Sequence, residues 1–226
     1  MKRIACIGDL HGDNRWKEVL SLSVDQIVFV GDYVDNPAIP PHRIVRNLIE
    51  VIELKRNHAT TVTLLLGNHD VQYLFYPQYS TAGFDEGQRI ELQQIFMDAA
   101  PLFQVASAYR DFVFTHAGLC RSWMSQFDLS TTNAYHISTY LNDMLSNDKR
   151  DLLAQVGTAR FGTDDYGGPW WCDYHKELVV DPLPGIHQVV GHTRTSFLIN
   201  QEIAGNRLIN VNYLAYSEEP IFVLEY

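Results

Sequence analysis

The chain has 226 residues, of which 46% are hydrophobic and 19% are charged. This composition predicts a folded protein and excludes a largely disordered chain. Lysine and arginine number 17 against 27 acidic residues, and the net charge of −10 disfavours non-specific binding to nucleic acids. The length fits a single domain over residues 1–226.

The cysteines and the N-terminal segment indicate the cellular compartment of the protein. Cys6, Cys120 and Cys172 are widely spaced and form no CxxC pair, so we expect free thiols rather than a disulfide scaffold. Asp9 interrupts the short apolar run near the N-terminus, which therefore lacks the pattern of a signal peptide. No apolar run reaches the length of a membrane span. We expect a soluble, cytoplasmic protein with no membrane partner.

The first third of the chain predicts alternating strands and helices. Three apolar runs end in glycine and predict buried strands at residues 3–8, 26–31 and 62–67. Helical patterns lie between them at 14–23 and 41–57. Alternation of this kind predicts βαβ units with largely parallel strands. In such sheets, ligands bind beyond the carboxyl ends of the strands.

The middle of the chain gives weaker signals. Residues 77–88 predict a loop, and residues 89–101 predict a short helix that ends at Pro101. Residues 102–119 predict two strands joined near Arg110 and Asp111, as in a hairpin.

The last part predicts helices followed by strands. Residues 122–156 have a polar, helical pattern, and the glycine-rich residues 161–174 predict a loop. Apolar and polar residues alternate over 187–226, which predicts several antiparallel strands. The chain shows no repeat and no linker, and its fold class is α/β.

Polar side chains follow five of the predicted strands, where a sheet of this type places its site. The set comprises Asp9, His11, Asp32, Asp35, Asn68, His69, Asp70, His116 and His192. Carboxylate, imidazole and amide groups without a thiolate suit manganese, iron or zinc. Six candidate ligands exceed the needs of one four-coordinate metal, and two metals that share a carboxylate fit better. Paired metals roughly 3.5–4 Å apart can clamp both oxygens of a phosphoryl displacement.

Five short motifs carry a resemblance to a known family. GDLHG, GDYVD, GNHD, THAG and GHT occur in the order found in calcineurin-like metallophosphoesterases, and they span residues 4–193. The chain most resembles the serine/threonine phosphatase branch and its bacterial and phage relatives, which include diadenosine-tetraphosphate hydrolases. The resemblance implies a four-layer α/β/β/α sandwich with two mixed β-sheets and a dinuclear metal site at the strand ends.

The resemblance also implies a role for each polar residue. Asp9 and His11 would bind the first metal, Asp32 would bridge both metals, and the second metal would be completed by Asn68, His116 and His192. The cofactor would be two divalent ions, with manganese expected and iron or zinc as alternatives. A metal-bound hydroxide would attack phosphorus directly.

Three further residues receive supporting or catalytic roles from the same resemblance. His69 would act as the general acid that protonates the leaving oxygen. Asp35 would orient His69, and Asp70 would support the loop.

The sequence departs from the family pattern where an arginine holds phosphate. Asn36 and Pro37 stand where the protein-phosphatase branch usually has Arg-Gly. Arg160, Arg194 and Arg121 are candidate substitutes for substrate binding. The last motif continues as GHTR and lacks the second histidine of many phosphodiesterases, which favours a phosphatase.

Three functions follow as hypotheses. The first is hydrolysis of phosphomonoesters, as a protein or small-molecule phosphatase. The second is hydrolysis of dinucleoside polyphosphates or phosphodiesters, which the altered arginine pattern and the pair Trp170 and Trp171 would suit. The third is a non-catalytic metal-binding scaffold. The expected partner is a phosphorylated small molecule, a nucleotide or a phosphopeptide, and the sequence leaves the oligomeric state open.

Overall fold

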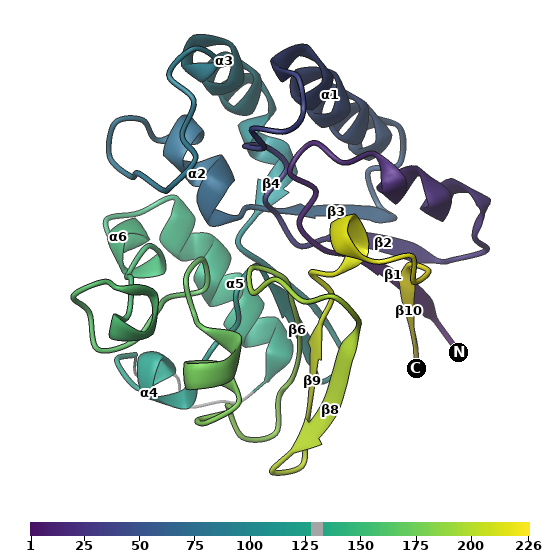
Figure 1. Cartoon of the computed structure of the whole chain (residues 1–226). Helices are drawn as coiled ribbons and strands as arrows, with labels where there is room; N and C mark the ends of the chain where they lie inside the picture. Colours follow the sequence, from purple (N-terminus) through teal and green to yellow (C-terminus); the bar gives the residue numbers. More distant parts are fainter. Residues whose placement is uncertain (128–132) are drawn as a thin grey trace.

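The computed structural model describes residues 1–127 and 133–226 (Figure 1). Two five-stranded sheets lie at its centre, and helices cover their outer faces. The helical prediction for residues 122–156 partly falls on residues 128–132, which lie outside the described part of the chain.

The first sheet contains the predicted βαβ units. Its strand order is β10-β1-β2-β3-β4, and β1 to β4 are parallel. The predicted strands are confirmed at β1 (Arg3–Ile7), β2 (Gln26–Phe29) and β3 (Val62–Leu65). The other two strands of this sheet are β4 (Phe103–Gln104) and β10 (Phe222–Glu225).

Helices cover the outer face of this sheet. The predicted helix is confirmed at α1 (Pro41–Asn57), which buries an apolar face that includes Ile44, Leu48 and Val51. The first predicted helix forms as a 3₁₀ helix, η1 (Arg15–Ser21). The helix α3 (Arg89–Ala99) is followed by one 3₁₀ turn, η2 (Ala100–Leu102). The helix α2 (Asn68–Leu74), which the sequence analysis did not predict, begins directly after Gly67.

The second sheet is mixed and has the order β5-β6-β7-β9-β8. The predicted hairpin is confirmed in β5 (Ala106–Tyr109) and β6 (Phe112–Thr115), which are antiparallel. The remaining strands are β7 (His187–Val190), β8 (Ile199–Ile203) and β9 (Asn206–Asn210).

The prediction of only antiparallel strands over residues 187–226 is wrong in part. Strand β7 pairs in parallel with both β6 and β9, and β10 leaves this sheet to pair antiparallel with β1. Only β8 and β9 form the expected antiparallel pair. Alternation of apolar and polar residues identifies a strand, but it does not identify the partner or its direction.

Short helices cover the second sheet. Among its described residues, the predicted helical region contains three of them, α4 (Arg121–Met124), α5 (Ala134–Leu145) and α6 (Arg150–Leu153). The predicted loop before β7 is mostly irregular. Single helical turns occur before β7 at η3 (Thr158–Arg160) and η4 (Tyr174–Leu178), and after β9 at η5 (Leu214–Tyr216). Among the described residues, no helix combines the length and apolar character that a membrane span needs.

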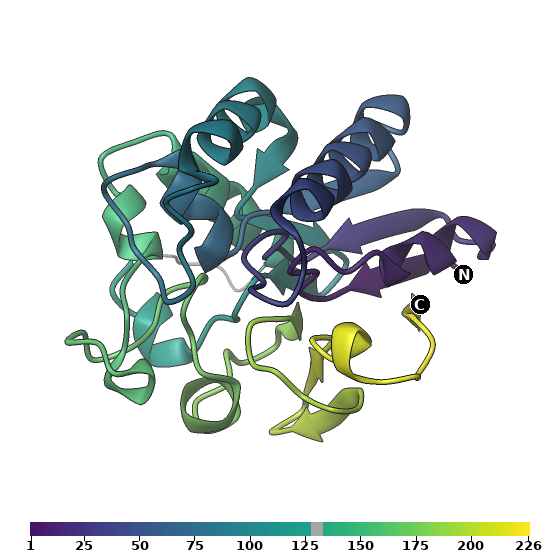
Figure 2. The same ribbon diagram turned by 45° about the horizontal axis from the view of Figure 1, so that its top comes forward.

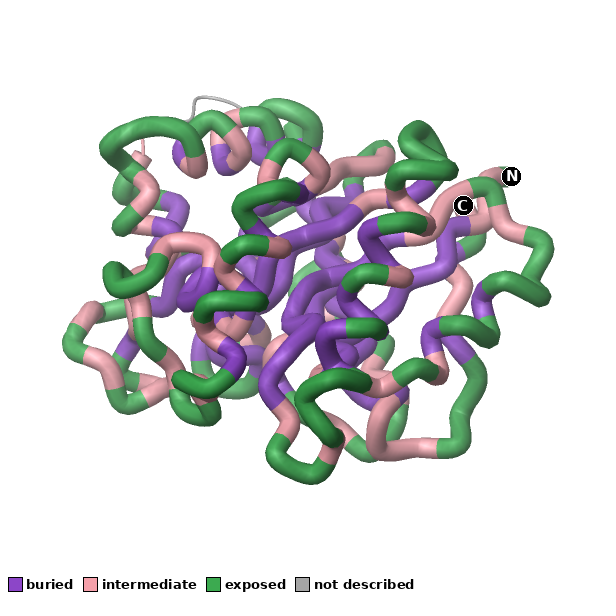
Figure 3. The backbone as a smooth tube through the Cα atoms, turned by 90° about the horizontal axis from the view of Figure 1, so that it is seen from above, coloured by how far each residue is buried: buried purple, intermediate pink, exposed green. Residues whose placement is uncertain are grey.

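The burial pattern confirms the four-layer α/β/β/α arrangement. Alternate residues of each strand face the other sheet, so that Ile4 and Val28 of the first sheet pack with Phe114 of the second in one core. Their neighbours Ala5 and Phe29 belong to the core beneath the helices. Figure 2 shows the helices outside the sheets, and Figure 3 shows buried chain running through the middle of the molecule. The three cysteines are free and buried.

Candidate metal centre and active site

The backbone bends sharply where the candidate ligands leave the strands. Seven non-glycine residues in the described part of the chain have a positive φ, and four of these are predicted site residues: His11, Asp32, Asp35 and His192. A left-handed conformation costs a residue with a side chain about 1–3 kcal/mol, and such strain is typical of functional sites. The four residues therefore occupy backbone positions that ordinary packing would not favour.

Asp32 lies at the centre of the cluster. Its Oδ2 atom is 3.3 Å from His116 Nε2 and 3.8 Å from His11 Nε2. Two groups of possible metal-binding residues share Asp32. One group adds His11 and His69, the other adds His116 and His192, and the ligand atoms of each group lie within 4.8 Å of one another. One carboxylate therefore faces two sets of donors.

Asp9 and Asn68 complete the two sides of the cluster. The Oδ2 atom of Asp9 is 3.9 Å from His11 Nε2, on the first side. On the second side, Asn68 Oδ1 lies 3.0 Å from His116 Nε2 and 2.9 Å from His192 Nδ1. The structure thus brings together all six residues that the sequence analysis named as candidate ligands.

Hydrogen bonds behind the cluster orient the imidazole rings. His11 Nδ1 donates to the Val34 carbonyl over 2.8 Å, and His116 Nδ1 donates to the Val30 carbonyl over 2.9 Å. Each bond places the ring proton on Nδ1, so the lone pair of Nε2 faces the cluster. The buried Nε2 atom of His192 has no hydrogen-bond partner among the described residues. This donor set fits a pair of divalent ions.

The charged side chains of the cluster shift one another's pKa values. Burial raises the pKa of Asp9 to about 6. Burial also opposes ionisation of Asp32, but positive charge on His116 and His69 holds its pKa below the usual value. Burial would lower the pKa of His116, but the negative charge of Asp32 outweighs it and raises the pKa to about 9. A protonated imidazole thus supplies positive charge that a metal ion could replace, with release of the proton.

Asp70 holds two strand ends together. Its buried carboxylate accepts hydrogen bonds from three backbone N–H groups, those of Gly67 and Asp32 at 2.8 Å and that of Tyr33 at 2.9 Å. A Cβ atom on Gly67 would lie 2.2 Å from Asp32 Oδ1, so only glycine allows this approach. The geometry fits the supporting role expected for Asp70.

His69 is held by a network around Asp35. Its Nδ1 atom lies 2.8 Å from Asp35 Oδ2, and its ring meets the His11 ring edge-on at 5.0 Å between centroids. The same carboxylate accepts hydrogen bonds from Gln72 Nε2 and from the Tyr73 hydroxyl. Burial lowers the pKa of His69, but the carboxylates of Asp32 and Asp35 outweigh this effect and raise it to about 9.

The sequence analysis missed the residues that hold Asp35 and Asp9. Gln72 and Tyr73 lie three and four residues after His69 on α2, a spacing that places them on the same helix face. The sequence analysis did not predict α2, so this spacing was not read as helical. Asn212 Nδ2 donates to Asp9 Oδ2 over 2.6 Å. Asn212 follows β9 as the earlier polar residues follow their strands, so its position was a usable signal.

The three candidate arginines lie in different surroundings. Arg160 forms an ion pair with Asp173 at 2.9 Å and donates a hydrogen bond to Thr193. Burial is the main cause of the lowered pKa of His192, and the positive charge of Arg160 adds to it. The remaining two are engaged elsewhere. The guanidinium of Arg194 lies 3.6 Å from the ring centroid of Tyr216, and Arg121 is paired with Asp181 at 2.8 Å.

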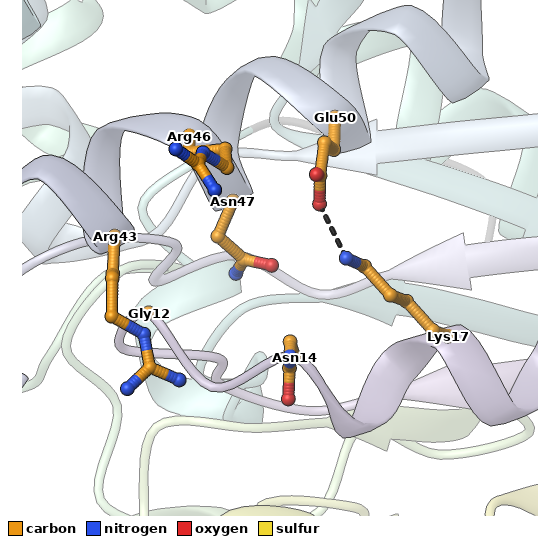
Figure 4. A pocket seen from close by; sticks show the side chains of 7 residues that line it. All are labelled: Gly12, Asn14, Lys17, Arg43, Arg46, Asn47 and Glu50. Atoms are coloured by element: carbon orange, nitrogen blue, oxygen red, sulfur yellow. Dashed lines mark ion pairs between the residues drawn. The ribbon is translucent and has the colours of Figure 1, made fainter.

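A basic pocket that the sequence analysis missed lies beside Gly12, the neighbour of His11 (Figure 4). It has a volume of about 230 Å³, and its cationic side chains are Lys17, Arg43 and Arg46. Lys17 is paired with Glu50 at 2.6 Å. Arg43 and Arg46 are exposed and three residues apart on α1, so they share a helix face.

Comparisons with known proteins address the family and the fold. The sequence profile of the family Calcineurin-like phosphoesterase matches residues 2–194. The fold is similar to that of a cold-active protein-tyrosine phosphatase from a psychrophilic Shewanella species, with a TM-score of 0.65 and 17% identity over 100% of this chain and 76% of that one. A protein serine/threonine phosphatase from Saccharomyces cerevisiae gives a TM-score of 0.53 and 17% identity over 93% of this chain and 66% of that one. No curated protein matches the sequence.

Proposed function

Because this chain belongs to the calcineurin-like phosphoesterase family, and thus to hydrolases that act on phosphoesters, we propose that it is a dinuclear metal-dependent phosphatase for phosphomonoesters. The observation that carries the proposal is the position of Asp32, whose Oδ2 atom lies 3.8 Å from His11 Nε2 of one proposed ligand set and 3.3 Å from His116 Nε2 of the other. A shared carboxylate is what a pair of metal ions needs, because it holds both ions close enough to act on one phosphoryl group.

The proposed ligands divide into two sets. Asp9 and His11 would hold one ion, Asp32 would bridge, and the other ion would be held by Asn68, His116 and His192. Manganese suits this mixture of oxygen and nitrogen donors, with iron or zinc as alternatives. When bound, the ions would neutralise the phosphoryl oxygens and make a coordinated water more acidic.

We propose His69 as the general acid. Its Nδ1 atom is bound to Asp35, so the other ring nitrogen remains free to reach a substrate. In the metal-free protein the carboxylates of Asp32 and Asp35 outweigh burial and raise the pKa of His69 to about 9, and the bond to Asp35 would favour the protonated ring in the loaded enzyme as well. The ring would give this proton to the leaving oxygen as the P–O bond breaks, and the attacking water would return a proton. Water and the phosphomonoester thus yield an alcohol and inorganic phosphate.

We propose Arg160 as the best placed of the candidate phosphate-binding residues, because its charge acts on His192. Arg194 is the next candidate, since it covers Tyr216, whose pKa burial raises with help from the negative charges of Asp9 and Asp32. Both Arg160 and Arg121 pair with an aspartate, but only Arg160 also donates to Thr193, the neighbour of His192, so Arg121 has the weakest support.

Hydrolysis of dinucleoside polyphosphates or phosphodiesters is the second candidate function. The basic pocket of Arg43 and Arg46 favours it, since the pocket adjoins the loop of His11 and could bind further phosphates. A non-catalytic scaffold has less support, because the six ligands and the His69–Asp35 pair are all present. We retain a cytoplasmic location as a proposal, in keeping with the three free thiols.

A direct rate comparison tests the proposal. The manganese-loaded protein should hydrolyse p-nitrophenyl phosphate faster than its bis-ester or diadenosine tetraphosphate. His69→Asn should keep its metal content and lose roughly two or more orders of magnitude in rate, as expected for a general acid. His42→Asn, an exposed residue on α1, is the matched control. A preference for the other two substrates would favour the second function, and no hydrolysis would favour the scaffold.

A further inference from the structure

A groove lies directly beside the His69–Asp35 pair. Its walls are formed by residues 35–41 and by residues 83–88, and its volume is about 400 Å³, within the range of small-molecule sites. Gly83 and Asp35 line the groove, and a Cβ atom on Gly83 would lie 3.6 Å from His69 Cε1, so the groove comes close to the imidazole. We call it the His69 groove. A group bonded to the oxygen that His69 protonates can extend into it.

The walls of the His69 groove are apolar and acidic. Pro37, Ile39 and Phe84 supply apolar surface, and the carboxylates of Asp85 and Glu86 lie on the same wall as Phe84. None of the described lining residues is a lysine or arginine. The nearby Arg89 is already paired with Glu86 at 2.8 Å. An aromatic or apolar group can therefore replace water in this groove, whereas an anionic group would meet an acidic wall and find no lysine or arginine among the described lining residues.

The groove is held open by the same residues that position the proposed acid. The Tyr73 hydroxyl donates to Asp35 and accepts from the backbone N–H of Asp85, and Gln72 accepts from the N–H of Thr81. The Phe84 ring stacks on Tyr73, with 5.1 Å between centroids. These contacts join the groove wall to Asp35, so the groove is preformed and keeps a fixed position relative to His69.

We propose that the His69 groove binds the leaving group of the substrate, and that it selects phosphomonoesters of uncharged aromatic or apolar alcohols. This inference rests on the proposed function and adds its substrate class. The basic pocket of Arg43 and Arg46 borders Gly12, next to His11, and is lined by other residues than the His69 groove, which alone includes Asp35 among its described lining residues. Substrates whose leaving group carries further phosphates are accordingly disfavoured, which separates the first candidate function from the second.

A pair of substrates that differ in one charge tests the inference. The two are phenyl phosphates with a para substituent, a methyl ester in one and a free carboxylate in the other. We expect the metal-loaded wild type to prefer the neutral ester. The double variant Asp85→Asn, Glu86→Gln should shift the ratio of the two kcat/KM values roughly three- to tenfold towards the carboxylate, as expected when partly exposed charges are removed. Comparing ratios cancels the intrinsic reactivity of each substrate.

Matched variants make the result specific. Glu91→Gln combined with Asp98→Asn removes two exposed charges from α3 and should leave the ratio unchanged. Phe84→Ala should raise KM for the neutral ester about tenfold, and Phe84→Leu should restore most of the loss, because an apolar side chain again fills the wall.

The outcomes distinguish this inference from the proposed function. An unshifted ratio in an active enzyme would overturn the groove assignment and leave the phosphatase intact. The groove assignment would also be overturned if the wild type preferred the carboxylate substrate and the double variant Arg43→Ala, Arg46→Ala abolished that preference. The basic pocket would then be the place of the leaving group. Arg56→Ala, an exposed residue on the same helix, is the control for that variant. Hydrolysis of neither substrate, nor of p-nitrophenyl phosphate, would contradict the proposed function itself.

Discussion

Replacement of Asp35 by asparagine should lower the pKa of His69. In the metal-free protein this pKa is about 9, against an ordinary value of 6.5, and a difference of this size corresponds to roughly 3 kcal/mol in favour of the protonated ring. Burial works against the proton, so the gain comes from the carboxylates of Asp32, Asp35 and Asp70. Asp35 contributes both a charge and a hydrogen bond of 2.8 Å. We expect Asp35→Asn to remove about one to two pH units.

An NMR titration of the His69 ring in chelator-treated protein measures this directly. Asp98→Asn, an exposed change on α3, should leave the titration unchanged. A variant pKa within about 0.3 of the wild-type value would refute the idea that Asp35 holds the proton on His69.

The raised pKa of His69 also makes the free energy of unfolding depend on pH. Because the folded pKa is raised, the stabilisation is complete below pH 6.5 and is lost as the pH rises through about 9. Asp35→Asn should flatten this dependence in urea denaturation.

Two further predictions concern the bridging ligand and an acidic pair. Asp32→Asn should lower bound manganese from two ions per chain to one or none, because it removes the carboxylate common to both groups; elemental analysis that finds both ions retained would argue against a bridge. Burial works to raise the pKa of Asp181, but hydrogen bonds from Ser122 and the charge of Arg121 hold it below the usual value. Its contribution to stability is therefore present above the unfolded pKa near 3.9 and is lost as the pH falls further. Asp181→Asn should lose less stability than wild type when urea midpoints are compared between pH 6 and 3; equal losses would contradict this reading.

The polar residues at strand ends were predictable because they follow a simple rule. Parallel strands end at one edge of a sheet, so Asp9, Asp32 and Asn68 had to meet once β1, β2 and β3 were adjacent. Sequence periodicity alone could identify those strands. The same rule identified His116 and His192, which follow β6 and β7 of the second sheet, and the resemblance to a family assigned both to the second metal.

What the sequence did not reveal depends on contacts between distant segments. The direction of β7 is set by its neighbours in space, so alternation along the chain could not supply it. Gln72 and Tyr73 have no unusual pattern, and only the fold brings them to Asp35. Arg160 and Thr193 are 33 residues apart in the sequence, and only the fold of the chain between them brings the two side chains together. The candidate arginines could therefore be named but not ranked.

The hydrogen bond from Asn212 to Asp9 has a consequence for how the site is assembled. It joins residues 203 positions apart, and β10, near the C-terminus, pairs with β1. All six candidate ligands lie before residue 194, within the segment that matches the family. A nascent chain that ends with this segment contains every candidate ligand, but not Asn212, which holds Asp9 in place. Because closing so long a loop is entropically costly, the metal centre is expected to be among the last parts of the protein to become ordered during synthesis.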